Sequence, residues 1–106
     1  MNVGLSGDVV AAIRAVLACD GNITAAKVFG SRAKGNYSAV SDVDLALFGG
    51  GGLLSAEKIR AELDELPYPF HFDVVFYDDL KNVQLRRHID RVGKTIYEAE
   101  TSGGGL

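Results

Sequence analysis

Apolar residues recur at helical spacing near the start of the chain. Ser6 precedes this pattern as a capping residue, Asp8 lies in the first turn, and Asp20-Gly21 follows its end. Because residues three and four apart lie on one side of a helix, the pattern predicts a helix that buries one face. Its buried residues are expected to be Val9, Val10, Ile13, Val16 and Leu17.

Four short runs have the composition of β-strands. Residues 26–29 and 43–48 are apolar, and a polar loop that contains glycine, 30–41, separates them. Residues 70–77, FHFDVVFY, are dense in aromatic and β-branched side chains, so we expect the clearest strand here, near the centre of the sheet. A short final strand is expected over 95–97.

A second helix is expected after the glycine run 49–52, whose composition is typical of a flexible connection. Ser55 is expected to cap it, with Leu54 and Ile59 forming a hydrophobic staple and Pro67 following its end. The buried face should consist of Ile59, Leu63 and Leu66.

A third helix is expected to open at Asp78 or Asp79 and to stop at Gly93. Its apolar side should contain Leu80, Val83, Ile89 and Val92. With no internal repeat, this succession of elements predicts an α+β (mixed α/β) fold in which helices back a small mixed sheet. We expect one domain over residues 1–100 and a frayed Ser/Gly-rich tail over 101–106.

Composition narrows the class of protein. With 106 residues, 47% of them hydrophobic and 24% charged, the chain has the make-up of a globular domain and not of a disordered one. The net charge of −3 argues against a protein held to nucleic acid mainly by phosphate contacts. A single cysteine, Cys19, excludes an internal disulfide, and we expect it to be buried. No targeting or membrane-spanning pattern is present, so the cytoplasm is the expected compartment, and a homo-oligomer stays open.

Paired carboxylates are the first chemical signal. Side chains alternate along a strand, so Asp42 and Asp44 are expected on the same face at the start of the run 43–48. Two like charges side by side favour a cation between them, and hard oxygen ligands suit Mg²⁺ or Mn²⁺. The alternative interpretation is a polar turn in which Asp42 caps the loop.

Gly30 and Ser31 follow the first strand and are the second signal. Glycine lets a bulky anion approach the backbone, and a serine hydroxyl with successive turn amides can bind phosphate oxygens. Arg32 and Lys34 come next and either contact the triphosphate or are solvated loop charges. The P-loop pattern is missing.

Asp73, in the middle of the clearest strand, is the candidate third carboxylate. An unpaired carboxylate among apolar side chains is destabilising unless a metal ion or a bound hydroxyl compensates. The alternative is an aspartate on an edge strand that faces solvent.

Residues 29–48, FGSRAKGNYSAVSDVDLALF, resemble the signature of the DNA polymerase beta nucleotidyltransferase superfamily: Gly-Ser, a ten-residue gap, then Asp-x-Asp before an apolar residue. More narrowly, they resemble the minimal nucleotidyltransferases, which are often encoded beside a helical HEPN partner. Asp73 and residues 96–98 extend the resemblance loosely. It implies a palm-like nucleotidyltransferase fold. It also implies that Gly30 and Ser31 bind the triphosphate, that Asp42 and Asp44 bind two Mg²⁺ ions, and that Asp73, the third catalytic carboxylate, helps to hold the catalytic metal ion.

The resemblance therefore implies a Mg²⁺-dependent enzyme that transfers a nucleoside monophosphate, AMP from ATP, to a hydroxyl with release of pyrophosphate. The expected acceptor is a tyrosine of a HEPN toxin, which makes the chain an antitoxin. One alternative is a non-catalytic antitoxin that neutralises its partner by occlusion. Another is transfer to a small molecule such as an aminoglycoside, or to an RNA end.

Other polar and aromatic residues carry weaker signals. His71 shares a strand face with Asp73, but a structural role at the start of the strand is the favoured interpretation. Tyr37 and Tyr77 could stack on a base, although packing is favoured. Residues 81–94 contain a basic patch formed by Lys81, Arg86, Arg87, Arg91 and Lys94. This patch either binds an acidic partner or RNA, or is simply a solvated helix face.

Overall fold

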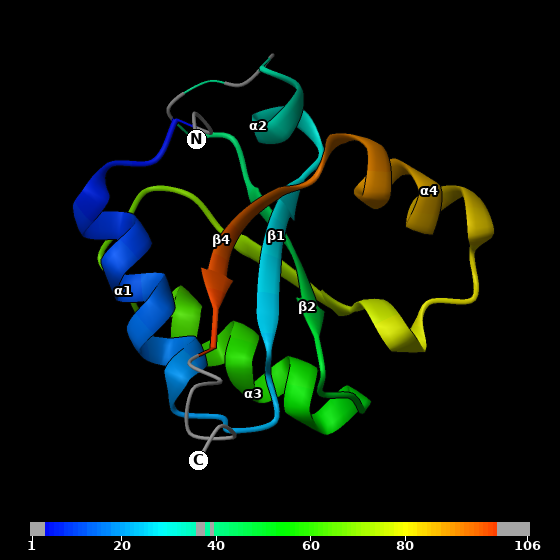
Figure 1. Ribbon diagram of the computed structural model, residues 1–106. Helices are drawn as coiled ribbons and strands as arrows, with labels where there is room; N and C mark the ends of the chain where they lie inside the picture. Colours follow the sequence, from blue (N-terminus) through cyan, green and yellow to red (C-terminus); the bar gives the residue numbers. More distant parts are fainter. Residues whose placement is uncertain (1–3, 36–37, 39, 100–106) are drawn as a thin grey trace.

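The computed structural model describes residues 4–35, 38 and 40–99. Its helices and strands alternate along the chain, and a short 3-10 turn, Tyr77–Asp79, precedes the last helix (Figure 1). The helices are α1 (Gly7–Ala18), α2 (Ser31–Lys34), α3 (Leu53–Asp64) and α4 (Val83–Val92), and the strands are β1 (Ala25–Phe29), β2 (Val43–Phe48), β3 (Phe72–Phe76) and β4 (Lys94–Glu98).

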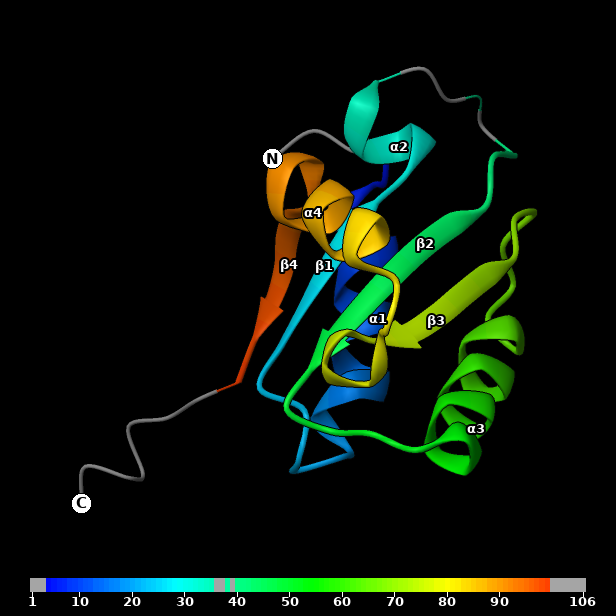
Figure 2. The same cartoon turned by 90° about the vertical axis from the view of Figure 1, so that its right-hand side faces the viewer.

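The four strands form one mixed sheet in the order β3-β2-β1-β4. β1 pairs antiparallel with both β2 and β4, whereas β2 and β3 run parallel. The mixed α/β fold predicted from the sequence is thereby confirmed. The prediction that β3 lies at the centre of the sheet is wrong: it is an edge strand (Figure 2). Its aromatic residues reflect packing against α3 on one face, which strand propensity does not distinguish from a central position.

Apolar side chains cover the sheet on both faces. On one face α1 and α3 pack over a larger cluster that includes Ile13, Leu45 and Phe72. On the other face α4 lies over a smaller cluster formed by Phe29, Ala46 and Ile89 (Figure 2). Burial of these apolar surfaces supplies the main stabilisation of the fold and fixes the strands that carry the polar residues.

The first helix agrees with the sequence, and its end shows one difference. Ser6 Oγ accepts a hydrogen bond of 3.4 Å from the N–H of Val9, as expected for the cap. Cys19 forms the C-terminal cap of α1 and is exposed, so the prediction that it is buried is wrong. It follows the last buried residue of the helix, Leu17, by two positions, which turns it toward solvent.

The starts of α3 and α4 differ from those predicted. α3 begins two residues before Ser55, after Gly52, and leaves Leu54 86% exposed, so the staple with Ile59 does not form. The run 49–52 was expected to be a flexible connection, but the N–H of Gly52 donates 2.8 Å to Asp79 Oδ2. Asp79 therefore holds this connection instead of capping the next helix.

α4 is capped by Asn82, whose side-chain oxygen accepts from the N–H of Leu85 at 3.1 Å. The preceding aspartates lie in the 3-10 turn, and Val83, expected on the apolar side, is 57% exposed. Gly93 ends the helix as predicted. Among the described residues, no helix is long and apolar enough to cross a membrane. The expected tail 101–106 lies outside the described residues.

Candidate active site

Asp44 and Asp73 meet where two parallel strands begin. Val43 and Phe72 are the first residues of β2 and β3 and pair in register, which places Asp44 directly opposite Asp73. The two carboxyl groups lie close enough for Asp73 to raise the pKa of Asp44. Because residues opposite each other on neighbouring strands point to the same face, the sheet itself creates this pair of acids.

This environment changes the acidity of Asp44. Burial raises the pKa of the half-buried Asp44 carboxyl to about 6, and the charges of Asp73 and Asp42 add to the effect. Two neighbouring carboxylates that repel each other hold a proton more tightly than either does alone. The pair is therefore a place where a positive charge is stabilising.

Gly30 lies directly against Asp44, one member of this pair. It follows Phe29, which is the partner of Asp44 on β1, and it has a positive φ of 74°. A Cβ atom at Gly30 would lie 2.2 Å from Asp44 Oδ2, and its three nearest neighbours are all atoms of Asp44. Glycine is required here by both the backbone conformation and the close approach.

Asp42 is exposed, one residue before β2. Its charge contributes to the raised pKa of Asp44, so it lies within electrostatic reach of the pair. Within residues 4–35, 38 and 40–99, no three or more acidic, histidine or cysteine side chains gather closely enough to hold a metal ion. The structure thus brings together two of the three expected carboxylates. As a donor set, this oxygen pair fits a hard divalent cation.

The expected phosphate-binding loop contains a helix that the sequence pattern did not predict. Residues 31–34 form α2, which begins directly after Gly30, and the N–H of Lys34 donates to Gly30 O at 3.1 Å. Ser31 is half-buried at its first position, and Lys34 is exposed. The first turn of a helix leaves N–H groups without helical partners, which suits an anion.

Arg32 occupies a different position from the one expected of a phosphate ligand. Its side chain is only 1% exposed and contacts segments distant in the sequence. Nε donates to Ser41 O at 3.0 Å, a terminal guanidinium nitrogen donates to Gly4 O at 3.2 Å, and the guanidinium stacks over Phe70 at 4.8 Å. Arg32 therefore holds the loop that ends at Asp42. Composition alone gave no signal for this role, because the partners are backbone carbonyls.

The remaining polar candidates have structural partners. His71 is exposed at the start of β3, where its carbonyl accepts 2.9 Å from Val43 N–H, in agreement with the structural interpretation. Tyr77 stacks on Phe48 and donates its hydroxyl to Asp90 at 2.9 Å, so packing is the role that the structure gives it. Tyr37 lies outside the described residues.

The basic patch lies on and around α4. Arg86 stacks over the Tyr77 ring at 4.8 Å, which commits one cation to packing. Arg87 and Arg91 are exposed one helical turn apart. They lie on the helix that covers the same sheet face as Asp44.

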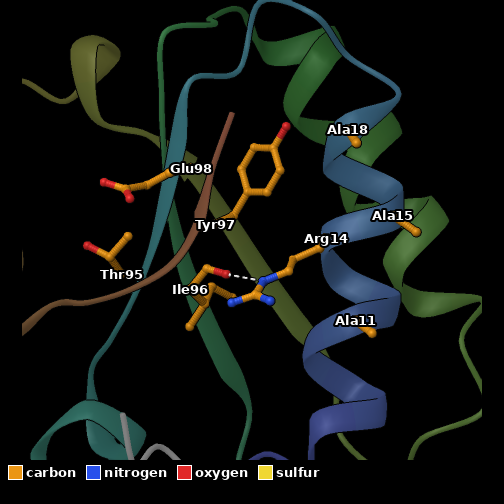
Figure 3. A pocket seen from close by; sticks show the side chains of 8 residues that line it. All are labelled: Ala11, Arg14, Ala15, Ala18, Thr95, Ile96, Tyr97 and Glu98. Atoms are coloured by element: carbon orange, nitrogen blue, oxygen red, sulfur yellow. Dashed lines mark hydrogen bonds between the residues drawn. The ribbon is translucent and has the colours of Figure 1, made fainter. Parts of the chain in front are cut away.

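A groove of about 550 Å³ lies at the other edge of the sheet, between α1 and β4 (Figure 3). Small residues of α1, among them Ala11 and Ala15, line it together with residues of β4. Arg14 crosses the groove and donates its Nε–H to Ile96 O at 2.7 Å. None of the predicted site residues lines this groove.

Residues 11–102 match the family model of Polymerase beta, Nucleotidyltransferase. The match spans most of the chain, so the protein belongs to the polymerase beta nucleotidyltransferase family. The carboxylate pair and Gly30 lie within the matched residues. A search of curated proteins finds no match.

Solved structures share the fold at low sequence identity. A toxin-antitoxin crystal structure with AMP-PNP is similar with a TM-score of 0.73 at 16% identity, covering 90% of this chain and 77% of that one. An MntA-HepT toxin-antitoxin structure has a TM-score of 0.69 at 14% identity, covering 89% of this chain and 74% of that one. A structure of a tri-AMPylated Shewanella oneidensis HEPN toxin in complex with MNT antitoxin has a TM-score of 0.61 at 13% identity, covering 91% of this chain and 75% of that one.

Proposed function

We propose that this chain is a Mg²⁺-dependent nucleotidyltransferase that transfers AMP from ATP to a hydroxyl of a protein, a tyrosine of a HEPN-type partner, and so acts as a cytoplasmic antitoxin. The observation that carries the proposal is the Asp44–Asp73 pair packed against Gly30 in a member of this family. The choice of nucleotide and partner is supported by the similar structures with AMP-PNP and with an AMPylated HEPN toxin.

The carboxylates are the proposed ligands of two Mg²⁺ ions. Asp42 and Asp44 lie two residues apart, and Asp73 is opposite Asp44 on the neighbouring strand. When bound, Mg²⁺ supplies positive charge that neutralises the carboxylates and the triphosphate. Loss of the Asp44 proton, whose pKa is about 6, prepares the pair for this role.

The triphosphate is proposed to lie at the start of α2. Gly30 permits close approach to the backbone, the Ser31 hydroxyl and amide are donors, and Lys34 provides an exposed cation. Arg32 acts as a positioning residue, since it fixes both the loop end at Ser41 and the N-terminal segment at Gly4. Without it, the spacing between α2 and Asp42 would not be held.

In the proposed reaction, the acceptor oxygen forms a bond to the α-phosphorus of ATP. The bond from that phosphorus to the oxygen that bridges to the β-phosphate breaks, and pyrophosphate leaves with the electron pair. The hydroxyl proton passes to a carboxylate, for which Asp73 is the candidate because it is exposed on an edge strand. The edge position leaves room for a large acceptor.

The decisive experiment separates AMP transfer from phosphate transfer. The chain is incubated with Mg²⁺, the HEPN-type protein encoded beside it, and ATP labelled on either the α- or the γ-phosphate. We expect label in the HEPN protein only from the α-phosphate. Transfer should be lost with Asp42→Asn/Asp44→Asn and kept with Asp8→Asn, an exposed aspartate of α1 outside the proposed site.

A non-catalytic antitoxin is the second candidate. It is favoured by one observation: within the described ranges, three carboxylates do not gather into a metal-binding cluster. If the two proteins form a complex but neither label is transferred, neutralisation by occlusion replaces the enzyme. Label that reaches an aminoglycoside or an RNA end instead of the protein would identify a different acceptor.

A further inference from the structure

The edge strand β3 has a backbone side that is open to a further strand. Within the described residues β3 pairs only with β2, and Val43 N–H donates to His71 O across that pair at 2.9 Å. Since successive residues of a strand alternate in direction, Phe72 and Val74 have their N–H and C=O groups on the outer side. Asp64 Oδ1 accepts the outward N–H of Phe72 at 3.2 Å. The outward groups of Val74 are thus the next available along the edge.

A groove of about 270 Å³ lies beside Val74. It is lined by the first turn of α3, by β3 and by the end of the 3-10 turn, and most of its lining is apolar: Leu53, Val74, Phe76 and Leu80. Leu53 is 76% exposed although it faces this groove. A large aliphatic side chain in such a place gains stabilisation only when another apolar group covers it.

One carboxylate lines this groove, and two more are next to its lining residues in the sequence. Asp79 lines it, Asp78 precedes Asp79 in the 3-10 turn, and Asp73 precedes Val74 on the strand. All three are exposed, and none forms an ion pair with another described residue. Asp79 additionally accepts from Gly52 N–H, which fixes its position at the groove. The chemistry complementary to this edge is a cationic segment with an apolar centre.

We propose that the β3 edge binds an extended, basic segment of the acceptor protein, which adds as a strand at Val74 and places an apolar side chain in the Leu53–Leu80 groove. This inference rests on the proposed function for the identity of the partner. Backbone hydrogen bonds at Val74 provide affinity, and the groove and these carboxylates provide selectivity. The segment would lie beside Asp73, so docking brings the acceptor to the carboxylate that is proposed to take its proton.

The test uses a blocked synthetic peptide, KVLVK, added to the full-length protein labelled with ¹⁵N. We expect shifts of the amide signals of Val74 and its neighbours and slower hydrogen exchange at Val74. Leu53→Asp should weaken the peptide's affinity by roughly tenfold, since a charged group replaces an apolar wall of the groove. Leu54→Asp is the matched control, because Leu54 is its neighbour in α3, is 86% exposed and does not line the groove.

Several outcomes would overturn the inference. These are equal binding of the acidic peptide DVLVD, unchanged affinity in Leu53→Asp, and shifts confined to β4. Protection of Val74 that grows with protein concentration alone would assign the edge to a second copy of this chain. Peptide binding is also measured in Asp42→Asn/Asp44→Asn, where it should persist. Loss of nucleotide transfer with retained peptide binding then separates failure of the proposed function from failure of the docking edge.

Discussion

The α-carbon of Gly30 lies against the carboxylate of Asp44, so that any side chain at residue 30 would overlap Oδ2 of that acid. The contact joins the end of β1 to the second residue of β2, where Phe29 and Asp44 are register partners. A loop suited to phosphate and an acid suited to a metal ion are thereby held at one fixed separation.

Gly30→Ala should lower the free energy of unfolding by about 2 kcal/mol, because alanine is strained at a positive φ and its Cβ displaces the Asp44 carboxylate. Urea denaturation measures the change. Gly35→Ala is the matched control, because Gly35 has a φ of 91° but nothing within 4 Å of an added Cβ. We expect it to cost about 1 kcal/mol, from backbone strain alone.

A double-mutant cycle isolates the contact. In an Asp44→Ala background the obstructing carboxylate is gone, so Gly30→Ala should cost no more than Gly35→Ala. If Gly30→Ala is as costly with Asp44→Ala as without it, the close approach of these two residues is not the cause.

Asp44→Asn should raise the free energy of unfolding at pH 7 by about 1 kcal/mol, a value reduced for the partial exposure of Asp44. The folded-state pKa of about 6 lies above the ordinary 3.8, so the native state binds the proton more tightly. The contribution of Asp44 to stability is therefore greatest below its ordinary pKa and falls as the pH rises from about 4 to 6. Melting temperatures are measured from pH 4 to 8. The fall with rising pH that Asp44 causes should disappear in Asp44→Asn and persist in Asp78→Asn.

Binding of Mg²⁺ with AMP-PNP should depend on pH in the opposite sense. The cation needs the ionised form of Asp44, so affinity should fall by about tenfold for each pH unit below 6 and level off above it. Isothermal titration at several pH values measures this. A constant affinity between pH 5 and 7 would remove Asp44 from the ligand set, and chelation of Mg²⁺ should abolish the thermal shift that the nucleotide produces.

Arg32→Met should destabilise the fold by about 2–4 kcal/mol, because it leaves the carbonyls of Gly4 and Ser41 without their buried donor. Arg32→Lys should recover only part of this, since one ammonium group cannot match the guanidinium's fork of donors. Lys34→Met, on the exposed side of the same helix, should change stability by less than about 0.5 kcal/mol. A purely structural role predicts loss of stability alone, whereas a positioning role also weakens nucleotide binding at temperatures where the variant is folded.

Hydrophobic periodicity was sufficient to predict the mixed α/β fold and its elements, except for α2 and the 3-10 turn. Ser6 and Gly93 mark their helix ends as expected, because capping is a local property of the chain. The starts of α3 and α4 were missed: Asn82 competes with aspartates of equal capping ability, and α3 starts after Gly52 although Ser55 is the better capping residue. The edge position of β3 depends on pairing between distant segments, which local pattern does not encode.

In the candidate site, too, local features could be predicted from the sequence and long-range contacts could not. Spacing alone predicted Asp42 and Asp44 on one strand face, and the composition of β3 singled out Asp73; the structure pairs Asp44 with Asp73 and leaves Asp42 exposed before β2. What spacing could not show is that Asp44 and Asp73 are register partners, or that Arg32 turns inward to two backbone carbonyls. Both depend on tertiary contacts across the sheet and its loops.

The hydrogen bond from Arg14 to Ile96 O makes the two edges of the sheet unequal. A strand that approached β4 would first have to displace a charged side chain, whereas no side chain among the described residues is hydrogen-bonded to the outward backbone groups of Val74. An assembly that extends this sheet therefore ends after one addition. If the proposed strand adds at β3, we therefore expect complexes of fixed stoichiometry and not open-ended filaments.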